Sequence, residues 1–149
     1  MGSFVFEHQW HLPFDPDVVY AALADVDSYR LWWPQVRRMQ RIDDESNHAF
    51  VRSLLPYTLH LVLTREVEDR DAGVLRVRIG GDLEGWSQWR VEDDAGATLA
   101  HYDQEATVTA PGLGRLVPLA RPLLRFNHSL MMRSGEEGLC GWLASRPTT

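Results

Sequence analysis

The sequence predicts an α+β protein in which a curved, seven-stranded antiparallel sheet wraps around one long C-terminal helix. Three features of the chain indicate this fold: one strand followed by two short helices, six consecutive strand-like segments from Val36 to Ala110, and a long helical segment at the end. Short polar turns separate the six segments, which is typical of antiparallel hairpins. A curved sheet needs cover on its concave face, and only the last helix is long enough to give it. We expect residues 1–149 to form a single domain.

The first strand covers residues 3–12, where apolar and polar side chains alternate. One face of this strand carries Phe4, Phe6, His8, Trp10 and Leu12. Asp15 is placed as the N-cap of the helix that follows, with Pro16 at its first position. Asp27 is placed to cap a second short helix, which Pro34 ends.

The central part of the chain predicts six strands, at residues 36–43, 49–55, 57–69, 74–81, 83–93 and 98–110. Alternate residues of a strand face opposite sides of the sheet, so parity assigns an inward face to most of them. On four strands this inward face carries Tyr57, Leu59, Leu61 and Leu63; Leu75, Val77 and Ile79; Leu83, Gly85, Ser87, Trp89 and Val91; and Ala100, Tyr102, Gln104, Ala106 and Val108.

The strand AFVRSLL at residues 49–55 leaves two alternatives. Either Val51, Ser53 and Leu55 point inward, or Phe50, Arg52 and Leu54 do. The second alternative buries the Arg52 guanidinium, which would then need an acidic ligand or a carboxylate partner. We favour the first, because arginine is rarely found buried without such a partner.

The last helix is predicted over residues 121–144, about 35 Å long. A helical wheel gives it one apolar face and an opposite face with Arg121, Arg125, Met132 and Glu136. The apolar face carries Leu123, Leu124, Asn127, Leu130, Met131, Ser134, Gly138, Gly141 and Trp142. Three glycines at 135, 138 and 141 each cost about 1 kcal/mol against alanine in a helix. Either the sheet approaches the helix closely there, or the missing side chains leave room for a ligand.

The interior predicted in this way is apolar with a few polar groups, namely those of His8, Tyr57, Ser87, Trp89, Tyr102, Gln104 and Asn127. A packed core with paired polar groups has this composition, and so does a pocket for an apolar ligand.

Composition excludes several classes of function. The net charge of −6 argues against nucleic acid as a partner, and no segment is apolar enough for membrane insertion. The absence of lysine excludes a Schiff-base mechanism, and a single cysteine, Cys140, excludes a cysteine metal cage. His8 and His11 fall on opposite faces of a strand, so we expect no metal site, and no motif indicates a cofactor. The first residues lack the basic region of a signal peptide, so we expect a cytoplasmic protein.

Three segments carry a resemblance to a known superfamily: FDPDVVYAALADVDSYRLWWPQV, GDLEGWSQWRV with the strand DDAGATLAHYDQEATV after it, and RSGEEGLCGWL in the last helix. Together with the order of elements, they resemble the START-like helix-grip (SRPBCC) superfamily, polyketide cyclase/dehydrase-like branch, over about residues 3–144. The resemblance implies a cavity between the long helix and the sheet that holds lipids, sterols or aromatic polyketides. It also places the turn that contains Trp32 and Trp33 near the rim of that cavity. We interpret Trp33, next to Pro34, as the anchor of this turn in the core and Trp32 as the residue nearer the rim.

The function predicted first is the binding or transport of a small apolar ligand. One alternative is a polyketide cyclase or aromatase, in which Tyr57, Tyr102 or Arg52 would donate to a developing enolate oxygen. Another is a non-catalytic domain with a filled cavity that acts through a partner protein. We expect a monomer or a weak homodimer. The expected ligand contacts are Trp10, Trp32, Tyr57, Leu61, Trp89, Tyr102, Gln104, Asn127, Met131 and Ser134.

Overall fold

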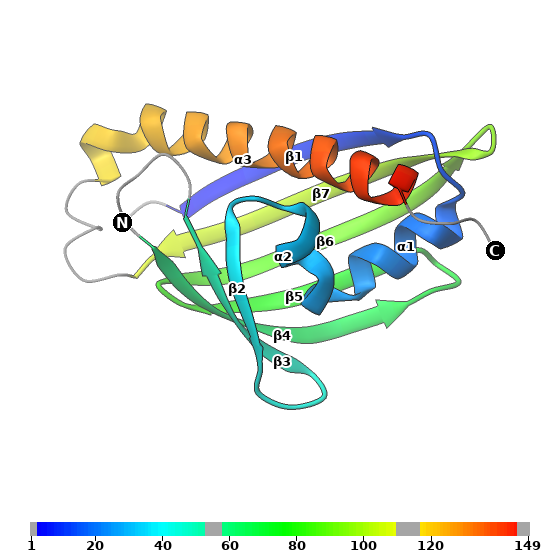
Figure 1. The fold of residues 1–149 in the computed structure, drawn as a ribbon. Coiled ribbons are helices and arrows are strands. Elements are labelled where there is room, and N and C mark those ends of the chain that lie inside the picture. The colour runs from blue at the N-terminus through cyan, green and yellow to red at the C-terminus, as the bar shows by residue number, and fades with distance from the viewer. Residues whose placement is uncertain (1–2, 53–57, 110–116, 146–149) are drawn as a thin grey trace.

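The computed structural model describes residues 3–52, 58–109 and 117–145, and it confirms the predicted fold (Figure 1). The elements in chain order are β1 (Ser3–Leu12), α1 (Pro16–Ala24), the 3-10 helix η1 (Val26–Ser28), α2 (Tyr29–Trp32), β2 (Val36–Arg41), β3 (Ser46–Val51), β4 (Leu59–Asp69), β5 (Val74–Gly81), β6 (Leu83–Asp94), β7 (Ala97–Val108) and α3 (Val117–Ser145). No helix within these described ranges has both the length and the hydropathy needed to cross a bilayer.

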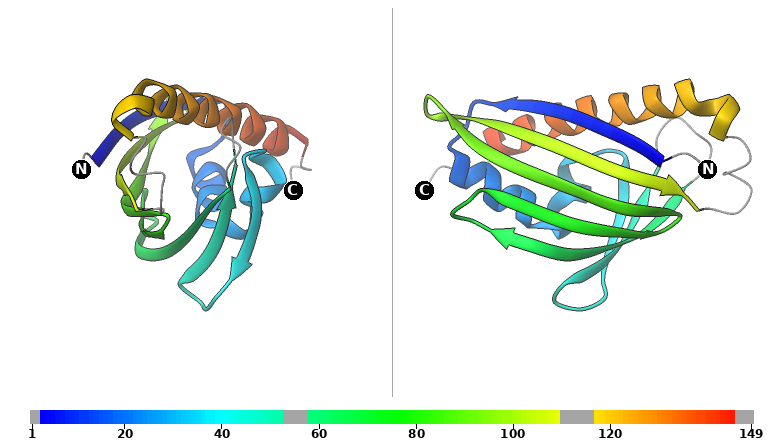
Figure 2. Two further views of the ribbon diagram at one scale, coloured as in Figure 1. Left: turned by 90° about the vertical axis from the view of Figure 1, so that its left-hand side faces the viewer. Right: turned by 180° about the vertical axis from the view of Figure 1, so that it is seen from behind.

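The sheet has the strand order β1-β7-β6-β5-β4-β3-β2, and every neighbouring pair is antiparallel. The first and last strands of the chain therefore pair with each other, while the hairpins follow in sequence. Seen from its end, the sheet curves from β1, beside α3, round to β2 and β3 (Figure 2). Helix α3 packs against β1 on one side and against α2 on the other, so it closes the concave side of the sheet.

The start of α1 follows the predicted capping. Asp15 accepts a hydrogen bond from the backbone N–H of Asp17 at 2.9 Å, and Pro16 occupies the first turn. The predicted cap at Asp27 is wrong, because its carboxylate instead accepts from Asn47 Nδ2 at 2.6 Å. Asp27 thereby ties the segment between α1 and α2 to strand β3.

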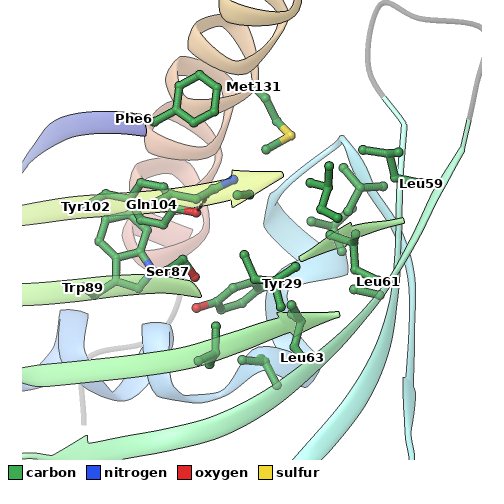
Figure 3. Close-up of a pocket in the computed structure, with 18 of the residues that line it drawn as sticks. Phe6, Tyr29, Leu59, Leu61, Leu63, Ser87, Trp89, Tyr102, Gln104 and Met131 are labelled. Carbon is green, nitrogen blue, oxygen red and sulfur yellow. Dashed lines mark hydrogen bonds between the residues drawn. The ribbon is translucent and has the colours of Figure 1, made fainter. Parts of the chain in front are cut away.

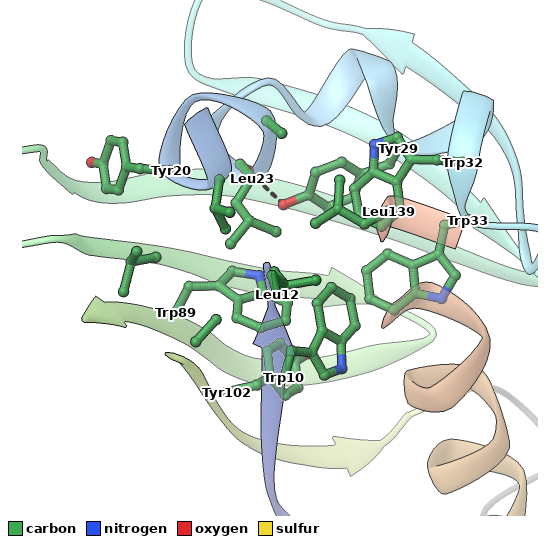
Figure 4. Packing of buried hydrophobic residues seen from close by; sticks show 14 of the residues in the cluster. Trp10, Leu12, Tyr20, Leu23, Tyr29, Trp32, Trp33, Trp89, Tyr102 and Leu139 are labelled. Atoms are coloured by element: carbon green, nitrogen blue, oxygen red, sulfur yellow. Dashed lines mark hydrogen bonds between the residues drawn. The ribbon is translucent and has the colours of Figure 1, made fainter. Parts of the chain in front are cut away.

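A cluster of tryptophans and tyrosines fills one end of the space between α3 and the sheet (Figure 4). The ring centroid of Trp10 lies 4.6 Å from that of Trp89 and 5.4 Å from that of Trp33. Trp32 stacks on Trp33 with the centroids 5.4 Å apart, and Tyr29 lies against both. We call these five residues the aromatic cluster. They are all less than a tenth exposed, so this end of the molecule is densely packed.

Helix α3 differs from its prediction in two ways. It begins at Val117, one turn earlier than predicted, with Pro122 inside it. Its buried face is also rotated from the predicted one. Met132, predicted to face outward, is 1% exposed, whereas Leu123, predicted to face inward, is 47% exposed.

The glycines of α3 explain this rotation. A Cβ atom at Gly135 would lie 2.6 Å from a ring carbon of Trp33 and 2.9 Å from one of Trp10, and a Cβ at Gly138 would collide with the carbonyl oxygen of Trp32. The helix therefore approaches the aromatic cluster closely at these two positions, which answers the alternative left open by the sequence. Gly141 is exposed, and a Cβ there would meet no described atom within 4 Å.

Candidate functional site

A cavity of about 210 Å³ lies between the first half of α3 and the concave face of the sheet (Figure 3). An apolar cavity of about 150 Å³ is enough for benzene, so this one accommodates a molecule larger than a single aromatic ring. Its apolar walls come from β1, β3, β4, β5, β7 and α3. They include Phe4, Phe6, Ala49, Val51, Leu59, Leu61, Leu63, Val77, Ile79, Ala106, Val108, Leu124 and Met131.

Polar side chains line part of this cavity, and they include Arg65 on β4 and Arg76 on β5. Ser87 on β6, Tyr102 and Gln104 on β7 and His128 on α3 also line it, and these four side chains are all less than a tenth exposed. The Tyr102 hydroxyl donates to Gln104 Oε1, and His128 Nε2 lies 3.2 Å from the same oxygen. We call Tyr102, Gln104 and His128 the polar triad. Figure 3 shows Tyr102 and Gln104 opposite Leu59, Leu61 and Leu63.

Burial keeps the ionisable members of the polar triad uncharged. Desolvation raises the pKa of Tyr102, against a smaller opposing effect of hydrogen bonding from Ser87. Desolvation, with a smaller contribution from His8, lowers the pKa of His128 to about 3. The phenol and the imidazole are therefore both neutral at pH 7.

The position of His128 is fixed by stacking. The ring of Phe6 on β1 lies parallel to the imidazole with the centroids 3.7 Å apart. Arg125, one turn earlier on α3, lies over the Phe6 ring at 5.8 Å. Stacking on Phe6 of β1, together with the approach of Nε2 to Gln104 on β7, thus fixes the imidazole ring.

Six of the predicted ligand contacts lie in the cavity wall: Leu61, Trp89, Tyr102, Gln104, Asn127 and Met131. Trp10 and Trp32 belong to the aromatic cluster and do not line the cavity, and neither does Ser134, because the rotation of α3 turns it away. Tyr57 lies outside the described residues.

The predicted roles of Trp32 and Trp33 are reversed. Trp33 lines the cavity, while Trp32 is buried in the aromatic cluster. The indole N–H of Trp33 donates to the Met131 carbonyl at 2.8 Å, which turns this ring toward α3 and the cavity. Trp32 Nε1 instead lies 3.4 Å from Ser28 Oγ, within its own helical segment.

Arg52 is exposed and does not line the cavity, whereas Ala49 and Val51 do. The favoured alternative for this strand therefore holds at Val51, while Ser53 and Leu55 lie outside the described residues. Arg52 takes part through its backbone, whose N–H donates to the Gln35 carbonyl at 2.8 Å. Its side chain is not placed to contact a ligand in the cavity.

His128 is a polar residue of the cavity wall that the sequence analysis missed. The helical wheel took its phase from Leu123, but the buried positions of α3 run His128, Met132, Gly135 and Leu139. This stripe keeps the spacing of three and four residues that marks a helix face, and it was the available signal.

A long helix closed over a curved antiparallel sheet, with an apolar cavity between them, defines the helix-grip class of proteins. The family described as polyketide cyclase / dehydrase and lipid transport matches residues 3–131, and the chain belongs to this family, within the START-like (SRPBCC) superfamily. No curated protein sequence matches the chain.

Solved structures with the same fold are distant in sequence. The aromatase/cyclase Zhui from Streptomyces sp. R1128 is 18% identical with a TM-score of 0.79, over 94% of this chain and 93% of its own. A protein from Thermus thermophilus is 17% identical with a TM-score of 0.75, over 97% and 100%. A START superfamily protein from Mycobacterium smegmatis is 12% identical with a TM-score of 0.71, over 94% and 96%. At these identities the likeness concerns the fold.

Proposed function

We propose that this protein binds a small, largely apolar molecule in the cavity between α3 and the sheet, and that it holds or transports this molecule without converting it. The observation that carries the proposal is the cavity itself, which combines apolar walls on several strands with a small number of polar side chains. Pockets for small apolar ligands combine apolar walls with a few placed polar groups in this manner.

The polar triad supports binding over acid–base catalysis. General acids and bases work best with pKa values near the operating pH. Burial moves the pKa of Tyr102 upward and that of His128 down to about 3, so both groups move away from neutrality. The Tyr102 proton is also engaged by Gln104.

The first test compares native and denaturing mass spectra of the purified protein. We expect a reproducible excess mass in the native spectrum that is lost on denaturation, and extraction then identifies the ligand class. If no excess mass is found, the protein is incubated with N-phenyl-1-naphthylamine, an apolar fluorescent probe. Failure to bind this probe as well would overturn the proposal.

A pair of variants on β4 locates the binding. Leu63 lines the cavity, whereas its neighbour Val62 points to the opposite face of the sheet. We expect Leu63→Trp to abolish binding of the probe by filling the cavity, and Val62→Trp to leave it unchanged. Equal binding by the two variants would place the probe elsewhere on the molecule.

The alternative is a polyketide cyclase or aromatase, favoured by the family description and by polar side chains able to contact carbonyl oxygens. Its test is the conversion of a poly-β-ketone thioester to a cyclic product at a rate above that of buffer. Arg52 has no part in this alternative, because its side chain is exposed.

The alternative of a partner-binding domain assumes that side chains fill the cavity. A cavity volume of about 210 Å³ does not support this assumption.

A further inference from the structure

The Gln104 carboxamide is a buried polar group with half of its hydrogen-bonding capacity unused. The side chain is 6% exposed and lies in the cavity wall. Its oxygen receives the Tyr102 hydroxyl and faces His128 Nε2, but among residues 3–52, 58–109 and 117–145 its nitrogen has no hydrogen-bond partner. Figure 3 shows this nitrogen turned away from Tyr102. A buried amide nitrogen without a partner in the protein is available to a ligand.

The orientation of this amide follows from the proton on the imidazole. A neutral imidazole has one N–H, and a carboxamide oxygen only accepts, so the proton resides on Nε2 of His128. Rotating the Gln104 amide by half a turn would make Nε2 an acceptor and move the proton to Nδ1. Nδ1 is buried and meets no hydrogen-bond acceptor in the described part of the chain. A buried N–H without an acceptor is rarer than a buried acceptor without a donor, so the first orientation is favoured.

We propose that Gln104 is the specificity-determining residue of the cavity and that it selects apolar ligands carrying an oxygen acceptor, above all a ketone or aldehyde carbonyl. Tyr102 and His128 act as positioning residues, because both donate to the Oε1 atom of Gln104. These two hydrogen bonds direct the amide nitrogen of Gln104 toward the ligand. A ligand without an acceptor would leave the amide N–H groups unpaired when it displaces water, which weakens its binding. This inference rests on the proposed binding function.

The experiment uses two probes of matched shape, 2-acetylnaphthalene and 2-isopropenylnaphthalene, in which a carbonyl oxygen and a CH₂ group exchange places. The quantity measured is the ratio of their affinities, compared between the wild-type protein and Gln104→Leu, because this comparison cancels their different solubilities in water. We expect the preference for the ketone to fall about 2- to 12-fold in the variant, the factor given by one hydrogen bond. Glu105→Gln, on the outer face of the same strand, is the matched control and should keep the wild-type ratio.

A spectroscopic readout separates hydrogen bonding from a structural effect of the substitution. The infrared C=O stretch of bound 2-acetylnaphthalene should lie below its frequency in dry hydrocarbon solvent in the wild-type protein. In Tyr102→Phe, which loosens the hold on the amide, we expect the band to move part of the way back. The wild-type measurement needs no variant, so it stands even if Gln104→Leu fails to fold.

The outcomes distinguish this inference from the proposed function. If both probes bind but the affinity ratio is the same in Gln104→Leu, or the carbonyl stretch equals its value in hydrocarbon, the role of Gln104 is refuted while the binding function stands. If neither these probes nor the smaller pair acetophenone and α-methylstyrene bind, the binding function fails and the inference fails with it.

Discussion

Two glycines of α3, Gly138 and Gly141, should respond in opposite directions to the same substitution. Alanine is favoured over glycine in a helix interior by about 0.5–1 kcal/mol. At Gly141 a Cβ meets no described atom within 4 Å, so we expect Gly141→Ala to stabilise the protein by that amount. At Gly138 the new Cβ would collide with the backbone carbonyl oxygen of Trp32.

The cost at Gly138 follows from what stands in the way. A carbonyl group cannot rotate aside as a side chain can, and Trp32 is confined by stacking on Trp33 and by contact with Tyr29. We therefore place the cost at the upper end of the usual range for overpacking, about 3 kcal/mol. After the helix-propensity gain of about 1 kcal/mol, Gly138→Ala should be destabilised by about 2 kcal/mol.

Urea unfolding monitored by circular dichroism measures both variants against the wild-type protein. The two substitutions should differ by about 3 kcal/mol in the free energy of unfolding, with similar denaturant slopes. Equal stabilisation of the two variants would show that α3 does not approach α2 as closely as the structure indicates. The reasoning about helix phase would then be refuted as well.

Three further predictions concern buried polar groups. Trp33→Phe removes the indole donor 2.8 Å from the Met131 carbonyl, and urea unfolding should show a loss of about 1–3 kcal/mol; an unchanged midpoint would mean that water replaces the donor. Burial lowers the pKa of His128 from its usual 6.5 to about 3 in the folded protein. As the pH falls, the unfolded chain therefore takes up the proton before the folded protein does. The wild-type protein should lose stability as the pH falls from about 6.5 to 3. The His128→Phe variant lacks this loss, and a difference in stability between the two proteins that stays constant with pH would contradict a neutral buried ring. Burial, with a smaller effect of Glu136, raises the pKa of the Cys140 thiol. A disulfide reagent at pH 8 should therefore react more slowly with the folded than with the unfolded protein. Equal reaction rates would argue against a shielded thiol.

The sheet could be predicted well from the sequence because a strand has only two faces. Once Leu59, Leu61 and Leu63 are recognised as one apolar set, parity fixes the inward face without knowledge of the neighbouring elements. Leu59, Leu61 and Leu63 of β4 line the cavity as this rule predicted, and so do Tyr102, Gln104, Ala106 and Val108 of β7.

Helix α3 and the turn before β2 could not be predicted to the same accuracy. A helix face is a continuous angle, and a shift of one residue moves it by about 100°. The phase of α3 depends on where Gly135 and Gly138 meet the tryptophans, which is a contact between segments about 100 residues apart. The same contact decides which of Trp32 and Trp33 reaches the cavity.

The polar triad joins residues from two elements that the sequence treats separately. Tyr102 and Gln104 were predicted because they share the inward face of β7. His128 enters the triad through Phe6 of β1 and through the phase of α3. The spacing of the stripe could have placed His128 on the buried face of α3, but it could not have shown that the imidazole meets Gln104.

The aromatic cluster shares only Tyr29, Trp33 and Trp89 with the cavity wall, and this limited overlap has a consequence for how the protein can evolve. The tight contacts of α3 with α2 and the tryptophans lie at one end, and the leucines and valines that line the cavity lie mostly at the other. Substitutions among the cavity leucines and valines can therefore alter the shape of the accommodated molecule while the close packing of α3 on α2 remains intact. Single mutations in the cavity can then change the preferred ligand, while the packing of α3 on α2 keeps the protein folded.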